Sequence, residues 1–182
     1  DPDEPGADAL PIRQLIALWS IDDHVRLNPS IDLRIGQGLS EEMLANFYQC
    51  TDIYAHPANS GGWELPPHEA AACGVPIVAV NAHAQNEWMQ TLPGCQLTSG
   101  DPWYDRTGAG YRIQGHMDEF VRGLLHYLEA GPEVRQRDGQ ANAEWAKDYT
   151  WDSIATRWET EVFQKMLDPN RKSERWRVLV EV

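Results

Sequence analysis

Cysteine is scarce in this 182-residue chain, with single residues at Cys50, Cys73 and Cys95. Their number is odd and their spacing is wide, so both a disulfide framework and a cysteine-based metal site are disfavoured. Each lies among apolar neighbours in the sequence. We therefore interpret all three as reduced core residues of a cytoplasmic protein.

Long apolar runs are absent and basic residues are few. No run approaches the roughly 18 apolar residues that read as a membrane-spanning helix, and no signal peptide precedes Asp1, where the acidic opening without methionine suggests a fragment or a processed piece. The chain has 15 Lys and Arg and 28 Asp and Glu, which gives a net charge of −13. Such a surface repels a phosphate backbone, which disfavours a nucleic-acid partner, whereas a small phosphate ligand can still bind at a local site.

Familiar catalytic motifs are also missing: the sequence has no Walker loop, no Ser-x-x-Lys motif and no nucleophile elbow. No two of the six histidines have metal-ligand spacing, and we interpret His56 and His68 as packed or rim residues rather than metal ligands. Gly36-Gln37-Gly38 lies between an expected strand and an expected helix, as a dinucleotide fingerprint would. Glu41 takes the place of its third glycine and would oppose a pyrophosphate, so a tight turn is the better interpretation.

Apolar periodicity predicts one α/β domain over residues 10–168, after a disordered acidic segment 1–9 and before a tail 169–182. Expected strands cover residues 31–35, 52–57, 77–80 and 95–98. Expected helices cover residues 11–19, 40–48, 66–73, 81–92, 117–130, 133–149 and 150–166, whereas the glycine-rich segment 99–115 has no assignable pattern. Strands and helices alternate in the first part of the chain and only helices follow. This order predicts a Rossmann-like parallel sheet flanked by helices, with a helical C-terminal region.

Two expectations concern which apolar residues are buried. In the helix that Ser40 caps, the expected buried stripe consists of Leu39, Met43, Leu44, Phe47 and Tyr48. The eight tryptophans lie mostly at helical spacing. We therefore expect most of them in the core.

Residues 55–80, AHPANSGGWELPPHEAAACGVPIVAV, are where we expect a ligand. Proline suits the first turn of a helix, so a helix should begin near Pro66, after a glycine loop, and end at Gly74. The run that follows, IVAV, reads as a strand buried on both faces. A glycine loop that enters a helix after a strand is an anion site, because free N–H groups and the helix dipole point at the ligand. We expect phosphate there, with the Glu69 carboxylate at one edge of the helix.

Residues 62–79, GWELPPHEAAACGVPIVA, resemble the donor-binding segment of retaining glycosyltransferases of the GT-B fold. That segment typically reads Glu-Gly-Phe-Gly-Leu-Pro-x-x-Glu-Ala-x-Ala-x-Gly-x-Pro-Val-Val-Ala and follows a strand ending in proline, as residues 52–57 do here. Glu87 and Thr150-Trp151-Asp152 are similar to later positions of the family. The resemblance spans about Ile31 to Met166 and implies the C-terminal half of a GT-B fold.

The resemblance implies a site for a nucleotide-sugar donor, with that substrate in place of a cofactor. The glutamate that matches Glu69 binds the ribose hydroxyls, a role that suits a carboxylate accepting two hydrogen bonds. Backbone N–H groups at positions 63–65 face the diphosphate or the sugar, and the turn at 37–39 borders the base. The implied substrate-binding residues are Gly38, Leu39, Gly62, Trp63, Glu64, Leu65, Pro66 and Glu69, with no catalytic residue and no metal ligand identified.

The sequence also departs from the family pattern. The family's first glutamate, which contacts the donor sugar, falls on Gly61. The second glycine of its loop falls on Glu64, which could replace that acid but would bring a negative charge near the phosphates. His68 stands where the family usually has an apolar residue. The arginine and lysine that clamp the diphosphate in the family, and its acceptor-binding domain, would precede this chain.

The resemblance leads us to expect the donor-binding half of a hexosyltransferase, which moves a hexose from a nucleoside-diphosphate sugar to an unidentified hydroxyl acceptor. Its partners would be the donor, the acceptor and an N-terminal acceptor-binding domain, so this chain alone would be an incomplete active site. Two alternatives stay open. One is a non-catalytic nucleotide-sugar-binding or interaction module, in which Gly61 and Glu64 mark a loss of chemistry. The other is a sugar-nucleotide epimerase of the same fold.

Overall fold

The computed structural model describes residues 12–26, 39–82 and 85–168, and the chain divides into two units, residues 1–46 and 47–182. In the first unit the expected first helix is confirmed as α1, Ile12–Trp19. The expected strand 31–35 and Gly38 lie outside the described residues. In the part of the chain that the structure describes, no helix is long and apolar enough to cross a membrane.

Helix α2, Glu41–Gln49, begins where the sequence predicts. The Ser40 hydroxyl accepts a hydrogen bond from the Met43 N–H at 3.2 Å, and two acidic residues in the first turn complement the helix dipole. The expected buried stripe is wrong in part. Met43 and Phe47 are exposed, and Tyr48 is the one residue of α2 that is buried.

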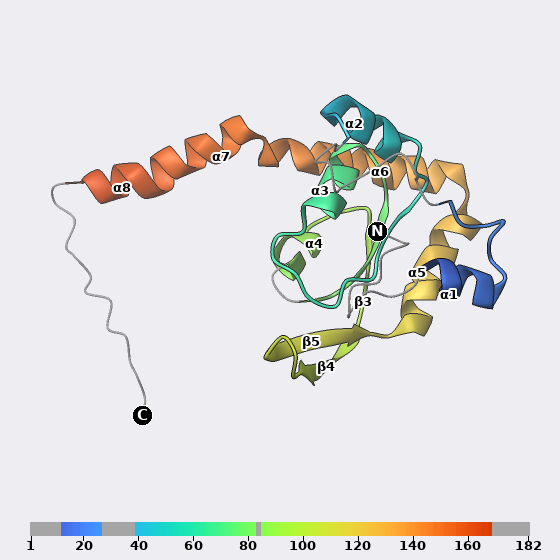
Figure 1. Cartoon of the computed structure of the whole chain (residues 1–182). Coiled ribbons are helices and arrows are strands. Elements are labelled where there is room, and N and C mark those ends of the chain that lie inside the picture. Colours follow the sequence, from blue (N-terminus) through green and yellow to red (C-terminus); the bar gives the residue numbers. More distant parts are fainter. Residues whose placement is uncertain (1–11, 27–38, 83–84, 169–182) are drawn as a thin grey trace. The chain divides into compact units, whose positions relative to one another are not determined.

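In the second unit, three parallel strands form a sheet in the order β1-β2-β3 (Figure 1). The strands are β1, Tyr54–His56; β2, Ile77–Val80; and β3, Cys95–Thr98. All four residues of the central strand β2 are buried, as the uninterrupted apolar run predicts. Because the strands are parallel, the ends of β1, β2 and β3 meet at one carboxyl edge of the sheet.

Helices cover both faces of this sheet, with α3 (Leu65–Ala72) and α4 (Asn86–Met89) on one face and α5 (Met117–Ala130) on the other (Figure 1). Alternate β2 side chains enter the two cores. Ile77 and Ala79 pack with residues of α3 and α4, whereas Val78 and Val80 pack with residues of α5. The predicted α/β class, a parallel sheet flanked by helices, is confirmed.

Helix α6, Pro132–Ala146, makes a close approach to the C-terminal end of α3. A Cβ atom on Gly139 would lie 1.9 Å from the carbonyl oxygen of Gly74, so only glycine fits at this crossing. The buried Asn142 amide donates to the carbonyls of Val75 at 2.9 Å and Gly94 at 3.1 Å, and its oxygen accepts the Gly94 N–H at 2.7 Å. These contacts fix α6 to the turns that lead into β2 and β3.

Segment 99–115, which the sequence left unassigned, is a β-hairpin of β4 (Gly100–Asp105) and β5 (Gly110–Gly115). Tyr104 and Tyr111 are paired across the two strands, with ring centroids 5.3 Å apart. The turn between them is stabilised by the Asp105 carboxylate, which accepts the Thr107 N–H at 2.9 Å. In the sequence, the hairpin connects β3 to α5.

The C-terminal helices are less buried than the sequence suggests. Thr150 caps α7 (Trp151–Arg157) by accepting the Ser153 N–H at 3.2 Å, as predicted. The other elements of this region are η3 (Lys147–Tyr149), η4 (Trp158–Phe163) and α8 (Gln164–Leu167). The expectation of a mainly buried tryptophan set is wrong: among the described tryptophans Trp88 alone is buried, and Trp151 is 89% exposed.

The cysteine expectation also needs correction. All three cysteines are free, as expected, but Cys50 is exposed and Cys73 and Cys95 are only half-buried residues. Burial of the Cys95 thiol raises its pKa to about 12. Cys50 follows α2 directly, and of its neighbours on that helix Phe47 is exposed whereas Tyr48 is buried, so apolar neighbours in the sequence do not predict burial of Cys50.

Candidate functional site

The loop after β1 and the N-terminus of α3 lie at the carboxyl edge of the parallel sheet, where ligands bind in open α/β folds. No side chain caps α3, and Pro66 and Pro67 have no N–H to offer. The N–H groups of Glu64 and Leu65 make no hydrogen bond to any residue that the structure describes. The helix thus presents unpaired amides of the kind that bind an anion.

Glu69 lies one turn into α3 and is half-buried. Its Oε2 accepts a hydrogen bond from the Tyr48 hydroxyl at 3.0 Å. Burial and then the adjacent Glu69 carboxylate raise the pKa of Tyr48, so this phenol remains a proton donor. Tyr48 therefore fixes one oxygen of Glu69 and leaves the carboxylate further capacity to accept hydrogen bonds.

A second acid, Glu64, lies beside the same group of rings. The Tyr54 ring lies 6.0 Å from Tyr48 and 6.1 Å from His56 between ring centroids, which makes a row of three rings. Burial first, then Glu64, then Glu69 raises the pKa of Tyr54. Both carboxylates therefore lie close enough to Tyr54 to disfavour its phenolate form.

The Glu64 backbone is left-handed, with φ of 60°, and this residue forms the N-cap of α3. Its carboxylate folds back over the loop, because a Cβ atom on Gly61 would lie 1.5 Å from Glu64 Oε1. His56 Nε2 lies 3.8 Å from Glu64 Oε2. Burial lowers the pKa of His56 and outweighs the opposite effect of Glu64, which favours a neutral imidazole.

The loop before α3 is anchored by an aromatic cluster. The Trp63 carbonyl accepts the Trp88 Nε1–H at 2.8 Å, and the two indole rings stack with centroids 6.0 Å apart. His68, Trp145 and Tyr149 complete the cluster, in which His68 is half-buried and burial lowers its pKa. His68 is thus a packed residue, as predicted, and the cluster holds the backbone on which the candidate site is built.

The hairpin fixes the same loop from another direction. The Ile113 N–H donates to the Asn59 carbonyl at 2.9 Å, and Arg112 Nη1 donates to Ser60 Oγ at 2.5 Å. Arg112 Nε also donates to Asp105 at 2.5 Å, and this bond lowers the pKa of the Asp105 carboxyl. Arg112 is therefore already paired and does not serve as a free cation for a phosphate.

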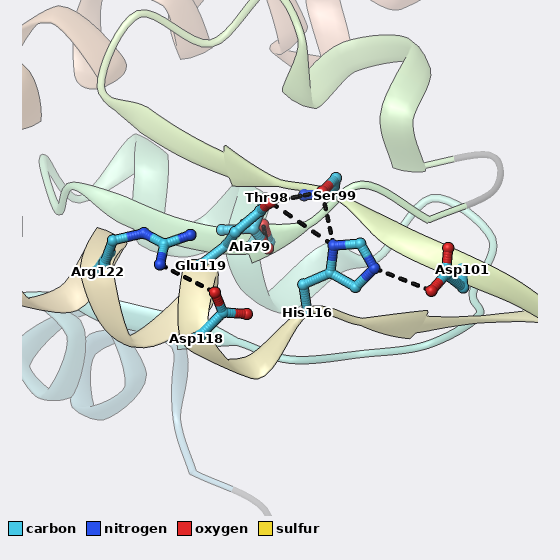
Figure 2. A network of polar contacts seen from close by, with 8 residues as sticks. All are labelled: Ala79, Thr98, Ser99, Asp101, His116, Asp118, Glu119 and Arg122. Atoms are coloured by element: carbon cyan, nitrogen blue, oxygen red, sulfur yellow. Dashed lines mark hydrogen bonds and ion pairs between the residues drawn. The ribbon is translucent and has the colours of Figure 1, made fainter.

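At the base of the hairpin, a polar network joins the end of β3 to the start of α5 (Figure 2). His116 lies between Ser99 Oγ, 3.0 Å from Nδ1, and Asp101 Oδ2, 3.0 Å from Nε2. Ser99 Oγ donates its single proton to Glu119 at 2.6 Å, so it accepts from His116. Although the residue types are those of a hydrolase triad, Nδ1 of His116 donates to Ser99 in this arrangement, so His116 is not placed to take the serine proton.

The residues expected from sequence fall into three groups. Glu64 and Glu69 lie beside one row of rings, and Trp63 anchors the loop. Gly62 in that loop and Leu65 and Pro66 at the start of α3 are exposed. Leu39 belongs to the first unit and Gly38 lies outside the described residues, so the expected turn beside the base stays a prediction.

Sequence reasoning missed the roles of Tyr48, Tyr54 and His56 in the site. A tyrosine at an otherwise apolar helix position is the signal that could have identified Tyr48, because a buried hydroxyl needs a partner. Among residues 12–26, 39–82 and 85–168, no group of three His, Cys, Asp or Glu side chains is arranged to hold a metal ion.

Comparison with known proteins identifies a family that matches this chain. A model described as glycosyl transferases group 1 matches residues 8–102. The D-inositol 3-phosphate glycosyltransferase of Streptomyces griseus is 28% identical over 166 residues, which cover 90% of this chain and 30% of that protein. The protein of the same name from Thermobifida fusca is 27% identical over 111 residues, covering 60% of this chain and 22% of that protein.

The fold is similar to a solved structure, the sucrose-phosphate synthase of Thermosynechococcus elongatus. The TM-score is 0.66 at 18% sequence identity, and the match covers 91% of this chain and 36% of that one. The chain thus spans about a third or less of the proteins it matches. The parallel sheet flanked by helices therefore has the fold of part of a GT-B protein.

Proposed function

Because the chain belongs to the glycosyl transferases group 1 family, we propose that residues 47–168 bind the nucleotide-sugar donor of a retaining hexosyltransferase. The observation that carries the proposal is the combination of Glu69, held by Tyr48, with unpaired amides at the start of the same helix. A carboxylate suits the two ribose hydroxyls, and the amides suit the diphosphate. The nucleoside-diphosphate sugar is the substrate, and no cofactor is proposed.

The reaction would be supported mainly by electrostatics. When an acceptor hydroxyl attacks the anomeric carbon, negative charge develops on the departing nucleoside diphosphate, and the amides of Glu64 and Leu65 would stabilise it. Arg112, the basic side chain that contacts the loop at Ser60, is already paired with Asp105. We therefore propose that further cationic groups come from another part of the protein.

An acceptor-binding domain outside this chain is the source that we propose for those groups. The Streptomyces griseus relative is about three times as long as the region that this chain matches, which supports a larger functional unit. The relatives are named D-inositol 3-phosphate glycosyltransferases and the similar solved structure a sucrose-phosphate synthase, so we leave the acceptor unassigned. Three free cysteines support a reducing, cytoplasmic setting for the reaction.

A thermal-shift panel on the full-length protein tests this function. The ligands are UDP, GDP, ADP, UDP-glucose, GDP-mannose and ADP-glucose, because a ligand that binds the native state alone raises the melting temperature. We expect one nucleotide and its sugar to raise it and the others to have little effect. If none of the six ligands changes the melting temperature or shows binding by calorimetry, the proposed function is wrong.

Product analysis with the ligand that binds then separates the remaining alternatives. Transfer of the hexose to added hydroxyl acceptors supports the transferase. Conversion of the bound sugar nucleotide without an acceptor identifies an epimerase, and binding with neither reaction identifies a non-catalytic module.

A further inference from the structure

The hairpin of β4 and β5 has two different faces, because side chains alternate along each strand. One face packs against the core beside α5 through Ile113 and carries the side chains of Pro102, Tyr104, Tyr111 and Ile113. The opposite face, defined here as the Trp103 face, carries the side chains of Asp101, Trp103, Asp105, Arg112 and Gln114. The Trp103 face therefore presents a single indole ring among charged and amide groups.

The Trp103 ring is open to a ligand. It is 40% exposed, it lies outside the aromatic cluster that anchors the loop before α3, and it has no stacking partner among the described residues. An indole offers a large, rigid and mainly apolar surface. Covering that surface with the apolar side of a ligand is favourable, because it removes the ring from water.

The polar groups around the indole are held in place. Arg112, directly across the strand pair from the indole, donates from Nε to Asp105 at 2.5 Å. At the base of the hairpin, Asp101 Oδ2 lies 3.0 Å from His116 Nε2 (Figure 2). The Asp101 side chain is 83% exposed, and its Oδ1 makes no hydrogen bond to any described residue, so this oxygen can accept a hydroxyl. The exposed Gln114, opposite Asp101, can both donate and accept.

The Trp103 face also lies near the proposed donor site. The hairpin follows β3 at the carboxyl edge of the sheet. Arg112 Nη1 donates to Ser60 Oγ at 2.5 Å, and Ser60 belongs to the loop that leads into α3. The Cα atoms of residues paired across two strands, such as Trp103 and Arg112, are about 5 Å apart. The indole is thus one strand away from a side chain that contacts the donor loop.

The composition of the face indicates which kind of ligand it fits. The centre of a protein-docking surface is depleted of charged residues. Here Asp101 and Asp105 flank Trp103 on its own strand and Arg112 lies opposite, so charged groups border the ring directly. A pyranose ring is complementary, because its C–H faces are apolar and its hydroxyls surround the edge. Aromatic surface with a few fixed polar groups is typical of small-molecule sites.

We propose that the Trp103 face binds the pyranose ring of a saccharide acceptor. The indole stacks on a C–H face of the sugar, while Asp101 and Gln114 form hydrogen bonds with its hydroxyls. This inference rests on the proposed function and adds the chemical class of the acceptor. In the transfer, the pyranoside oxygen bonds to the anomeric carbon of the donor, the bond from that carbon to the diphosphate breaks, and the hydroxyl proton passes to the departing diphosphate.

Saturation-transfer NMR on the full-length protein tests the site with methyl α-glucopyranoside, methyl α-mannopyranoside and methyl β-galactopyranoside. We expect at least one pyranoside to bind, with the strongest transfer to C–H protons of its ring. Trp103→Ala should weaken this binding by roughly five- to twentyfold, and Trp103→Phe by roughly two- to fivefold. Asp101→Asn keeps an oxygen for His116 and should weaken binding by roughly three- to tenfold, because the hydroxyl loses a charged acceptor.

Tyr111→Ala is the matched control, because Tyr111 is an exposed aromatic residue on the other face of the same hairpin. This variant should bind the pyranoside as the unmodified protein does. Hydrogen exchange of the Ile113 N–H, which donates to the Asn59 carbonyl at 2.9 Å, reports whether the hairpin stays attached in each variant. Trp103→Phe keeps a ring on the strand and decides the comparison if Trp103→Ala loses this protection.

The outcomes separate this inference from the proposed function. If no pyranoside binds, or if the Trp103 and Tyr111 variants weaken binding equally, the Trp103 face is not a saccharide site. If a pyranoside binds at Trp103 but receives no hexose from the donor, its assignment as the acceptor is overturned. The thermal-shift panel contains no pyranoside, so a failure of donor binding is seen there independently.

Discussion

Tyr48 and Glu69 show how a single hydrogen bond can prepare the proposed donor site. Glu69 Oε2 accepts the Tyr48 hydroxyl at 3.0 Å, and burial raises the pKa of the phenol, so the proton stays on Tyr48. A glutamate on an open helix face would lose side-chain rotamer freedom when it binds a ligand. Part of that rotamer freedom is already lost on folding, because Tyr48 restricts the Glu69 carboxylate.

We therefore predict different losses for two substitutions. Glu69→Ala should weaken nucleotide-sugar binding by about 1.5 to 3 kcal/mol, as expected for a hydrogen bond to a charged group. Tyr48→Phe removes only the supporting hydroxyl and should cost about 0.5 to 1.5 kcal/mol. Calorimetry with the ligand that binds in the thermal-shift panel measures both. Equal affinity of the Glu69 variant and the unmodified protein would remove this residue from the site.

Sequence could predict Glu69 and could not predict its partner. The spacing from Pro66 to Gly74 places Glu69 on a short helix after a loop, and both ends of that helix agree with the structure to within about two residues. Tyr48 is 21 residues away, and its contact with Glu69 depends on tertiary packing and not on local sequence. Hydrophobic periodicity marks a position as buried but does not show which polar atom a buried hydroxyl meets.

At the scale of elements, the crossing of α3 and α6 depends on a glycine. Replacing glycine by alanine within a helix normally stabilises it by about 0.5 to 1 kcal/mol. At Gly139 the new Cβ would lie 1.9 Å from the backbone oxygen of Gly74, which cannot rotate away as a side chain could. The unfavourable contact should therefore exceed the gain in helix propensity.

Gly139→Ala should accordingly lower the free energy of unfolding by about 1 to 3 kcal/mol, in the range of overpacked cores. Urea unfolding of the full-length protein measures the change. Gln140→Ala is the matched control, because this exposed neighbour lies on the same helix. A Gly139 variant that is as stable as the control, or more stable, would contradict the close packing of α3 and α6.

The His116 network makes attachment of the hairpin depend on pH. The Asp101 carboxylate, followed by Glu119, raises the pKa of His116 above its usual 6.5. The folded state then binds the proton more tightly than the unfolded state does. The stabilisation is complete below the unfolded pKa and is lost as the pH rises through the folded pKa.

We predict that the melting temperature of the unmodified protein exceeds that of His116→Asn by an amount that shrinks as the pH rises above the usual histidine pKa of 6.5 and through the raised pKa of His116. The measured quantity is the difference in melting temperature between the two proteins at each pH. A single melting curve is not enough, because burial lowers the pKa values of His56 and His68 and gives those residues the opposite pH dependence. His126→Asn, at an exposed position on α5, is the control. A difference that does not change with pH would contradict a charged His116.

Elements with strong periodicity or clear end signals were predictable, whereas the hairpin was not. The apolar run of β2 and the bounds of the helix expected over residues 117–130 agree with the structure. Segment 99–115 has no Asn-Gly or Asp-Gly turn, and its four-residue turn depends on an Asp105 side-chain contact and a left-handed Ala109 with φ of 48°. Its strands are held by Asn59 and Ser60, which no local pattern reveals.

At the scale of the whole molecule, apolar side chains on the last helices lack cover within the described chain. Trp151 is 89% exposed and Met166 is 61% exposed, although the helical spacing of the apolar residues over 151–166 predicts one buried face, and the neighbouring Leu167 is 80% exposed. An amphipathic stripe without a partner marks an interaction surface. The relatives that this chain matches are about three times longer or more, so the proposed acceptor-binding domain is the partner we expect here.

This expectation leads to a prediction for the full-length protein. Trp151→Ser and Leu167→Ser should each lower its melting temperature by roughly 2 to 8 °C, since removing a buried apolar side chain costs about 1 to 2 kcal/mol. Within the present chain neither side chain has enough cover to produce such a loss. Lys165→Ser, at an exposed position on the same helix as Leu167, is the control. Melting temperatures that match the control in both variants would show that these side chains remain in solvent in the complete protein, and the acceptor-binding domain would then have to contact another surface.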